Sequence, residues 1–110
     1  MKLVRDKIPE IIEKSGKKPI IHIAEDNEYW EELKNKLNEE VNEFLEKENE
    51  EELADIIEVI HAISDYKKFS LEDIEKLRIK KSEERGGFKN KIILEGIQWK
   101  WTESSWLKRI

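Results

Sequence analysis

The amino-acid sequence predicts an all-α protein built around two amphipathic helices that pack as an antiparallel pair. Residues 28–46 and 50–67 carry apolar side chains at the three- and four-residue spacing of helices that bury one face. The joint between them is short and polar, so we expect the second helix to fold back along the first. The chain has 110 residues, which suits one domain whose single core gains from association with a partner.

A short helix and an extended segment are predicted before this pair. Asp6 is a residue type that caps helices, Pro9 is tolerated in a first turn, and Gly16 ends the helix. Residues 19–24 (PIIHIA) begin with proline and carry isoleucines around His22, which favours a short strand or a strap across the bundle. We interpret His22 as a structural or exposed histidine because no second ligand lies at a recognised spacing from it.

The two central helices have strong apolar stripes. The first is predicted over about residues 28–46, with Asp26 or Asn27 as its N-cap, and the second over about 50–67. Their stripes consist of Trp30, Leu33, Leu37, Val41 and Phe44 in the first helix, and of Leu53, Ile56, Ile57, Ile60 and Ile63 in the second. These are the residues expected to form the core.

A last helix and a tail of different composition follow. Ser70 opens the sequence SLED, a capping box with Asp73 in its third position, and the helix is predicted from Leu71 to about Arg85. Residues 1–95 are therefore predicted to form a single all-α domain. The remaining residues, 96–110, are rich in tryptophan and are expected to pack on the domain or on a partner. The run Ile92, Ile93 and Leu94, just before these residues, is expected to be irregular or β-like. The tryptophans of the tail are Trp99, Trp101 and Trp106.

Two pairs of acidic residues lie on the central helices, Glu40 with Glu43 and Glu52 with Asp55. Residues three apart in a helix differ by about 60° around its axis, so each pair shares one face. On adjacent antiparallel helices these pairs would bring four carboxylates together. Glu40 borders its apolar stripe and Glu52 falls within its own, where an unpaired charge costs several kcal/mol.

The spacing of these acids leaves two interpretations open. A divalent cation would relieve the repulsion among four carboxylates, and carboxylate oxygens are the hard ligands that Mg²⁺ prefers. In contrast, 43% of the residues are charged, and solvated glutamate-rich helix faces are typical of such a chain. The first interpretation predicts a magnesium site and the second predicts an ordinary helical surface.

Composition excludes several classes of protein. A net charge of −5 argues against a protein that binds a nucleic-acid backbone. Because cysteine is absent, we expect no disulfide or thiol chemistry and a location in the reducing cytoplasm. No apolar run approaches the roughly 20 residues that span a bilayer, and the start MKLVRDKIPE lacks the apolar core of a signal peptide. We therefore expect neither a nucleic-acid polymer nor a membrane as a partner.

Four blocks of the sequence carry a family resemblance: KLVRDKIPEII, KLNEEVNEF, EELADIIEVIHAI and KKSEERGGF. Together they resemble the all-alpha nucleoside triphosphate pyrophosphatases, which include MazG and phosphoribosyl-ATP pyrophosphatase, and above all the phosphoribosyl-ATP pyrophosphohydrolase-like branch. The family motif E-x-x-E followed by E-x-x-D is matched by Glu40, Glu43, Glu52 and Asp55. The joint between the two acid pairs is shorter than in many MazG-type proteins, and the tail has no counterpart.

The resemblance implies a magnesium-dependent hydrolase, with Mn²⁺ as the alternative metal. It would cleave a nucleoside triphosphate between the α and β phosphates and release a monophosphate and pyrophosphate. The four motif residues Glu40, Glu43, Glu52 and Asp55 would be its metal ligands and catalytic residues, one of them acting as a base through water. Two alternatives are cleavage of phosphoribosyl-ATP in histidine biosynthesis and a non-catalytic nucleotide-binding helical dimer.

The resemblance also implies phosphate contacts and a partner subunit. Lys36, one turn before the first acid of the motif, is the first candidate for a phosphate contact, followed by Arg5, Lys7, Lys81 and Arg85. Lys81 and Arg85 would equally suit the dipole at the end of their helix. Since these helices are too few to enclose a nucleotide, we expect a homodimer or higher homo-oligomer with a MazG-like four-helix core.

Overall fold

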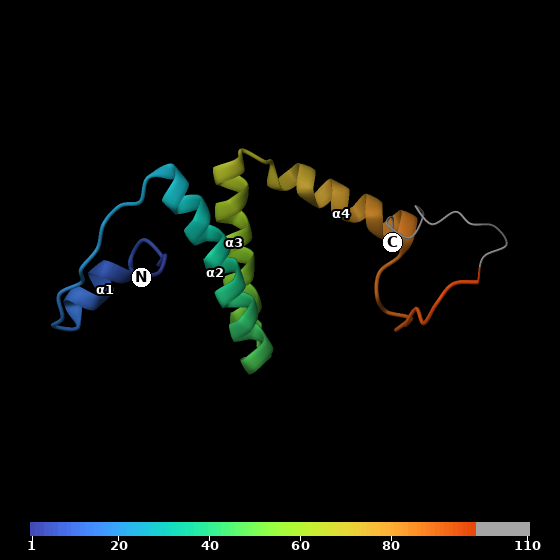
Figure 1. Cartoon of the computed structure of the whole chain (residues 1–110), viewed down its shortest axis with the longest axis horizontal. Coiled ribbons are helices and arrows are strands. Elements are labelled where there is room, and N and C mark those ends of the chain that lie inside the picture. The colour runs from blue at the N-terminus through green and yellow to red at the C-terminus, as the bar shows by residue number, and fades with distance from the viewer. Residues whose placement is uncertain (99–110) are drawn as a thin grey trace. The chain divides into compact units, whose positions relative to one another are not determined.

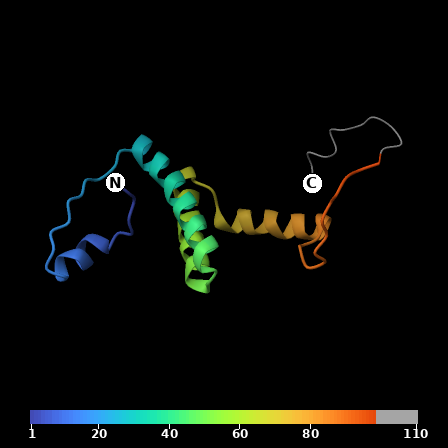
Figure 2. The same ribbon diagram turned by 60° about the horizontal axis from the view of Figure 1, so that its bottom comes forward.

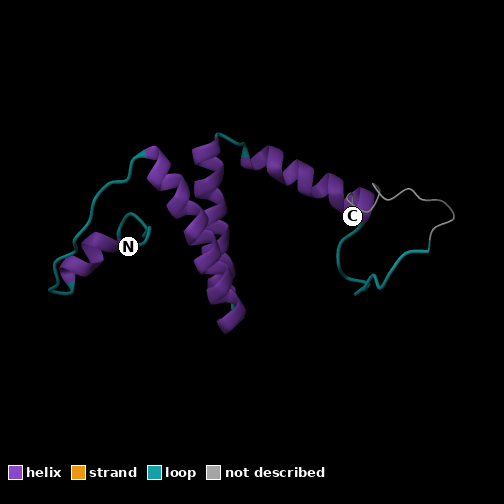
Figure 3. Cartoon of the chain, in the orientation of Figure 1, coloured by secondary structure: helices purple, strands orange, loops and turns teal. Residues whose placement is uncertain are grey.

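The computed structural model describes residues 1–98, and these form helices and loops without a strand. The helices are α1 (Ile8–Lys14), α2 (Asp26–Lys47), α3 (Glu50–Lys67) and α4 (Leu71–Arg85) (Figure 1). Figure 3 shows that loops join them throughout the described part of the chain. The prediction of an all-α fold is confirmed for these residues. The tryptophans of the predicted tail, Trp99, Trp101 and Trp106, lie outside the described residues.

The chain divides into two compact units, Met1–Leu77 and Arg78–Ile110. The first unit contains α1, α2, α3 and the beginning of α4, and the second contains the end of α4 and the residues after it. The four acids of the predicted motif all belong to the first unit. Among the described residues, no helix is long and apolar enough to cross a membrane.

Helices α2 and α3 form an antiparallel hairpin, and both views show them side by side (Figures 1 and 2). The turn between them has only two residues, Glu48 and Asn49. Glu48 adopts the left-handed conformation with a φ of 50°, which ends α2. The Asn49 side chain accepts a hydrogen bond of 3.0 Å from the Glu52 backbone N–H and so caps α3. This cap fixes the first turn of α3, and Glu52 belongs to that turn.

The core of the hairpin is small. Leu33 of α2 and Val59 of α3 are the buried apolar residues of the described chain, with exposed fractions of 1% and 7%. Ser64, in the C-terminal part of α3, is also buried, and so are two acids, Glu40 and Glu52. Several residues of the predicted core stripes are instead exposed, namely Val41, Leu53, Ile57 and Ile60. A single hairpin has one seam, so it cannot bury the full width of both stripes.

The N-cap predictions for α1 and α2 were wrong. Helix α1 begins at Ile8 with Lys7 as its N-cap, because the Ile8 N–H already bonds to the Arg5 carbonyl and draws Asp6 into the preceding turn. Helix α2 begins at Asp26 with Glu25 as its N-cap, and no side chain caps it. In its first turn Asp26 still complements the helix dipole.

The predicted cap of α4 is confirmed. The Ser70 hydroxyl accepts a hydrogen bond of 3.2 Å from the Asp73 backbone N–H, which is the half of the capping box that the Ser70 side chain supplies. The bounds predicted for α3 and α4 agree with the structure, and α2 extends slightly beyond its predicted range at each end.

The predicted extended segments are not strands. Residues 19–24 form a loop between α1 and α2, in which Ile20 and Ile23 are almost fully exposed. The run from Ile92 to Leu94 is also a loop with exposed side chains. A strand needs a neighbouring strand to pair its backbone groups, and the described chain provides none. His22 is exposed, as predicted, and its Nε2 lies 2.9 Å from the Glu28 carboxylate.

Candidate functional site

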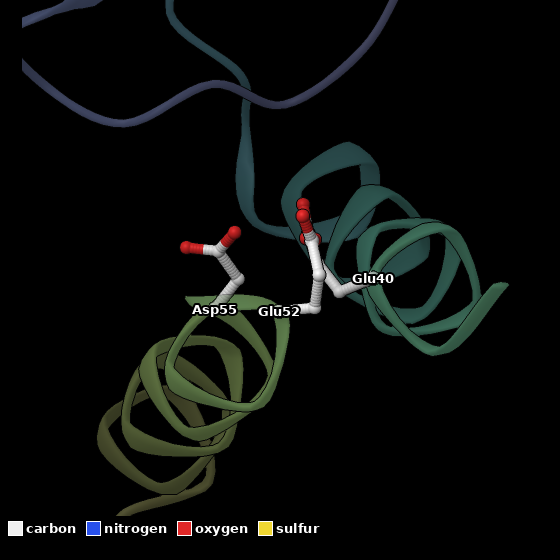
Figure 4. Close-up of side chains that lie close together, drawn as sticks. All are labelled: Glu40, Glu52 and Asp55. Carbon is white, nitrogen blue, oxygen red and sulfur yellow. The ribbon is translucent and has the colours of Figure 1, made fainter. Parts of the chain in front are cut away.

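Three carboxylates converge between the two helices of the hairpin (Figure 4). Glu40 of α2 and Glu52 and Asp55 of α3 each offer an oxygen atom, and these atoms lie within 4.8 Å of one another. Glu40 and Glu52 are both buried, with 8% of their surface exposed, whereas Asp55 is partly exposed. The two helices therefore bring together three of the four acids that the motif predicts.

The fourth predicted acid, Glu43, is not part of this group. Its carboxylate pairs with Lys47 at 3.2 Å, one turn further along α2. The reason is geometric: Glu43 lies about 60° further around α2 than Glu40, and Lys47 at the i+4 position is within its reach. The prediction that all four carboxylates meet is therefore wrong for Glu43 in this structure.

Each converging carboxylate has a basic partner. Asp55 accepts a hydrogen bond of 2.8 Å from Arg5 Nη2. Glu40 pairs with Lys36 Nζ at 3.1 Å, and Glu52 lies 3.7 Å from Lys47 Nζ. The Lys36–Glu40 pair is the most buried of the three. Three positive side chains thus offset the charge that three neighbouring carboxylates would otherwise concentrate at this site.

Two pKa shifts reflect these pairings. The carboxylates of Glu43 and then Glu52 raise the pKa of Lys47, because each stabilises the ammonium form. Burial alone would raise the pKa of Glu39, but the neighbouring Lys36 and Lys2 outweigh it and lower the pKa. Lys2 Nζ lies 3.3 Å from Glu39, so the N-terminal residues contact α2 as well as α3. These contacts hold the N-terminal segment beside the hairpin.

A cleft of about 620 Å³ opens beside this group and is lined by two of its acids, Glu40 and Asp55. The N-terminal segment, α2 and α3 form its walls. Its lining residues are Lys2, Leu3, Val4, Arg5, Asp6 and Ile8 from the N-terminal part, Tyr29, Leu33, Lys36 and Glu40 from α2, and Asp55, Glu58, Val59, His61, Ala62 and Asp65 from α3. Its volume is within the range of about 300–1,000 Å³ that is usual for small-molecule sites.

The predicted basic residues have different positions relative to the cleft. Arg5 and Lys36 line it and contact two of the three acids. Lys7 is the exposed N-cap of α1 and is not among the lining residues. Lys81 and Arg85 lie on the last turns of α4, in the second unit of the chain.

Several residues of the cleft were not predicted from the sequence. Tyr29 lies eleven residues before Glu40, which places both on nearly the same line along α2, so helical periodicity could have found it. Asp65 lies ten residues after Asp55 on α3, which is about 80° around the helix axis, so periodicity counted from Asp55 does not predict it. Lys2 and Asp6 come from an irregular segment, and no spacing rule connects such a segment to a distant helix.

The three carboxylates fit a hard divalent cation. Each can supply an oxygen ligand, and Mg²⁺ commonly binds through few carboxylates while keeping several water molecules. The partly exposed Asp55 and the adjacent cleft leave room for water and for a ligand on the open side of the group. Lys47 connects Glu43 to this group, because its Nζ lies 3.2 Å from Glu43 and 3.7 Å from Glu52.

Comparison with known proteins gives one similar chain and no family. An uncharacterised protein of Mycolicibacterium smegmatis is 55% identical over 42 residues, which are 38% of this chain and 43% of that protein. The matched part therefore spans less than half of that relative. No family model matches the chain. No solved structure matches it either.

Proposed function

We propose that this protein is a Mg²⁺-dependent nucleotide pyrophosphohydrolase of the all-alpha nucleoside triphosphate pyrophosphatase type. The observation that carries the proposal is the convergence of Glu40, Glu52 and Asp55 beside a cleft of ligand size. The proposed reaction cleaves the bond between the α and β phosphates of a nucleoside triphosphate and yields a monophosphate and pyrophosphate. Metal ions held by oxygen ligands assist several kinds of hydrolysis. The spacing of the acids, which matches the E-x-x-E and E-x-x-D motif, supports cleavage of a nucleoside triphosphate among them.

In this proposal the acids and the basic residues of the cleft have separate roles. Glu40, Glu52 and Asp55 would hold Mg²⁺, or Mn²⁺ in its place. When bound, the metal would neutralise phosphate charge and make a water molecule more acidic. One carboxylate accepts the proton of the attacking water. Arg5 and Lys36 then contact phosphate oxygens instead of their present carboxylate partners, which orients the polyphosphate along the cleft.

We further propose that the active form is a homodimer or higher homo-oligomer of hairpins. Five apolar residues of α2 and α3 are exposed in the isolated chain: Val41, Leu45, Leu53, Ile57 and Ile60. A second hairpin on this surface would complete a four-helix core with the usual packing of such bundles. The buried apolar residues of one hairpin, Leu33 and Val59, are few for a chain of this length, which supports the need for a partner.

The test is Mg²⁺-dependent release of pyrophosphate from a panel of nucleoside triphosphates and phosphoribosyl-ATP, using wild-type protein and Glu52→Gln. The substitution preserves the size of the side chain and removes its charge, so we expect turnover to fall at least about 100-fold while the helical circular dichroism spectrum is retained. Glu51→Gln is the matched control, because Glu51 is the exposed neighbour on the same helix. Equal turnover in wild type and Glu52→Gln would overturn the proposal.

A further inference from the structure

The cleft has two chemically different ends. On α2 its lining residues Tyr29, Leu33, Lys36 and Glu40 follow one another at helical spacing. Tyr29 and Glu40 are eleven residues apart, which corresponds to about 16 Å along a helix. Helix α3 runs in the opposite direction, so its C-terminal part lies beside Tyr29. The Tyr29 and Tyr66 rings confirm this placement, since their centroids are 5.6 Å apart.

The basic residues of the cleft lie at the end where the carboxylates of Glu40, Glu52 and Asp55 converge. Arg5 and Lys36 contact the converging carboxylates directly, and Lys2 contacts Glu39, the neighbour of Glu40 in α2. This is the end where a metal-bound polyphosphate would have both its cation and its positive side chains. Between the two ends lie the apolar residues Leu33, Val59 and Ala62, and Glu58 and His61 line the same stretch of α3.

The end around Tyr29 has the opposite character. Asp6 from the N-terminal segment and Asp65 from α3 line it together with the partly buried Tyr29 ring. The contact of the Tyr29 and Tyr66 rings places Asp65, the residue before Tyr66, at the Tyr29 end of the hairpin, and Asp6 lines the same cleft. In agreement with this placement, burial and then the charges of Asp6 and Asp65 raise the pKa of Tyr29. Two acceptor-only carboxylates and one aromatic ring suit a ligand that has a flat apolar surface and hydrogen-bond donors at its edge.

We infer that Tyr29, Asp6 and Asp65 form the nucleoside end of the substrate site and select nucleosides that present N–H or O–H donors to the two carboxylates. This inference rests on the proposed function, because it takes the converging carboxylates as the phosphate end. The Tyr29 ring packs against the nucleoside, and Leu33, Val59 and Ala62 line the cleft between this ring and the phosphates. The donors are the exocyclic amine of the base or the hydroxyls of the ribose.

The experiment measures binding of non-hydrolysable nucleotides by calorimetry in the presence of Mg²⁺. The probes are the α,β-methylene triphosphates of adenosine, guanosine and cytidine. For the tightest binder, one analogue lacks the exocyclic amine and another lacks both ribose hydroxyls. We expect one of these deletions to weaken binding about tenfold or more, which is the usual effect of losing a hydrogen bond to a charged group. The analogue that loses affinity identifies the donor.

A substitution in the protein completes the test. Asp65→Asn should weaken binding of the parent nucleotide by a similar factor but leave the affinity for the donor-deleted analogue nearly unchanged, since the two changes remove one interaction. Asp73→Asn is the matched control, because Asp73 lies in the first turn of α4 and does not line the cleft. Thermal unfolding of both variants shows whether they fold as the wild type does.

The outcomes separate this inference from the proposed function. If both donor-deleted analogues bind as tightly as the parent, or if none of the three nucleotides binds, the nucleoside-end assignment is wrong. If pyrophosphate release still depends on Glu52 in that case, the proposed function stands without it. If Glu52→Gln retains full turnover, both fall together.

Discussion

The two sides of the α2–α3 hairpin differ sharply in how their side chains are paired. On the side of the cleft, each converging carboxylate has a basic partner, and the N-terminal segment covers part of the surface. On the other side, apolar residues of both helices are exposed. Leu45 is about 140° around α2 from Glu40, and Ile60 is about 140° around α3 from Asp55. Their exposed fractions are 64% and 39%.

This difference indicates that the two sides serve different kinds of contact. Charged groups that are already paired tolerate water and leave a cleft open to a small ligand. Exposed apolar side chains gain roughly 25 cal/mol for each Å² that a partner covers, so that side favours association. In our proposal the hairpin combines a small-molecule side with a subunit side, and each could be disrupted without the other.

The largest effect is expected from a charge on the apolar side. Ile57→Glu places a carboxylate in the proposed subunit contact, where it would be desolvated without a partner. We expect the dimer dissociation constant to rise at least about 100-fold, measured by light scattering over a range of protein concentrations. Ile20→Glu is the control, because Ile20 is equally apolar but lies in the loop before α2. A wild-type protein that is monomeric at high concentration would contradict this assignment.

Binding of Mg²⁺ tests the cleft side. At a concentration 100 times its dissociation constant, a ligand that binds only the folded state stabilises a protein by about 2.7 kcal/mol. We expect Mg²⁺ to raise the midpoint of thermal unfolding of the wild type and to have little effect on Glu40→Gln. Glu39→Gln, which changes the neighbouring acid outside the converging group, should respond as the wild type does. If Mg²⁺ raises the unfolding midpoint of Glu40→Gln by a similar amount, Glu40 is not a ligand of the metal.

Arg5 links the N-terminal segment to the acidic group, and its removal should affect function more than stability. The Arg5–Asp55 pair is 2.8 Å long, but the Arg5 side chain is 56% exposed, so water screens it. For Arg5→Met we expect a loss of about 1 kcal/mol or less in unfolding free energy. We expect the KM for nucleotide to rise about tenfold, because a phosphate contact is lost. Lys7→Met, outside the cleft, should leave the KM unchanged. A KM that does not respond to Arg5→Met would exclude Arg5 as a phosphate contact.

The smallest effect concerns the turn that joins the two helices. Glu48 has a φ of 50°, a conformation that costs a non-glycine residue roughly 1 kcal/mol. Glu48→Gly should therefore stabilise the hairpin by up to about 1 kcal/mol in urea unfolding, although glycine also gains entropy in the unfolded chain. Glu46→Gly, within α2, should instead destabilise by about 1 kcal/mol. A loss of stability in Glu48→Gly would show that the Glu48 side chain makes a contact that stabilises the hairpin by more than the backbone strain costs.

Local patterns in the sequence account for much of the fold. The apolar spacing predicts α2, α3 and α4, because a helix that buries one face requires that spacing whatever surrounds it. The Ser70 cap was predictable for the same reason, since its hydrogen bond spans only three residues. The acid pairs could also be placed on their helix faces, and Glu40 and Glu52 were expected at or within the apolar stripes where the structure buries them.

The sequence alone determined the helices and the faces on which the acids lie, because both follow from interactions within a few residues. Only the tertiary structure decided that Glu43 lies outside the converging group and that Arg5 reaches Asp55. It also decided that Asp6, Asp65 and Tyr29 line one cleft. These contacts depend on the path of the chain between distant residues, and helical periodicity carries no information about that path.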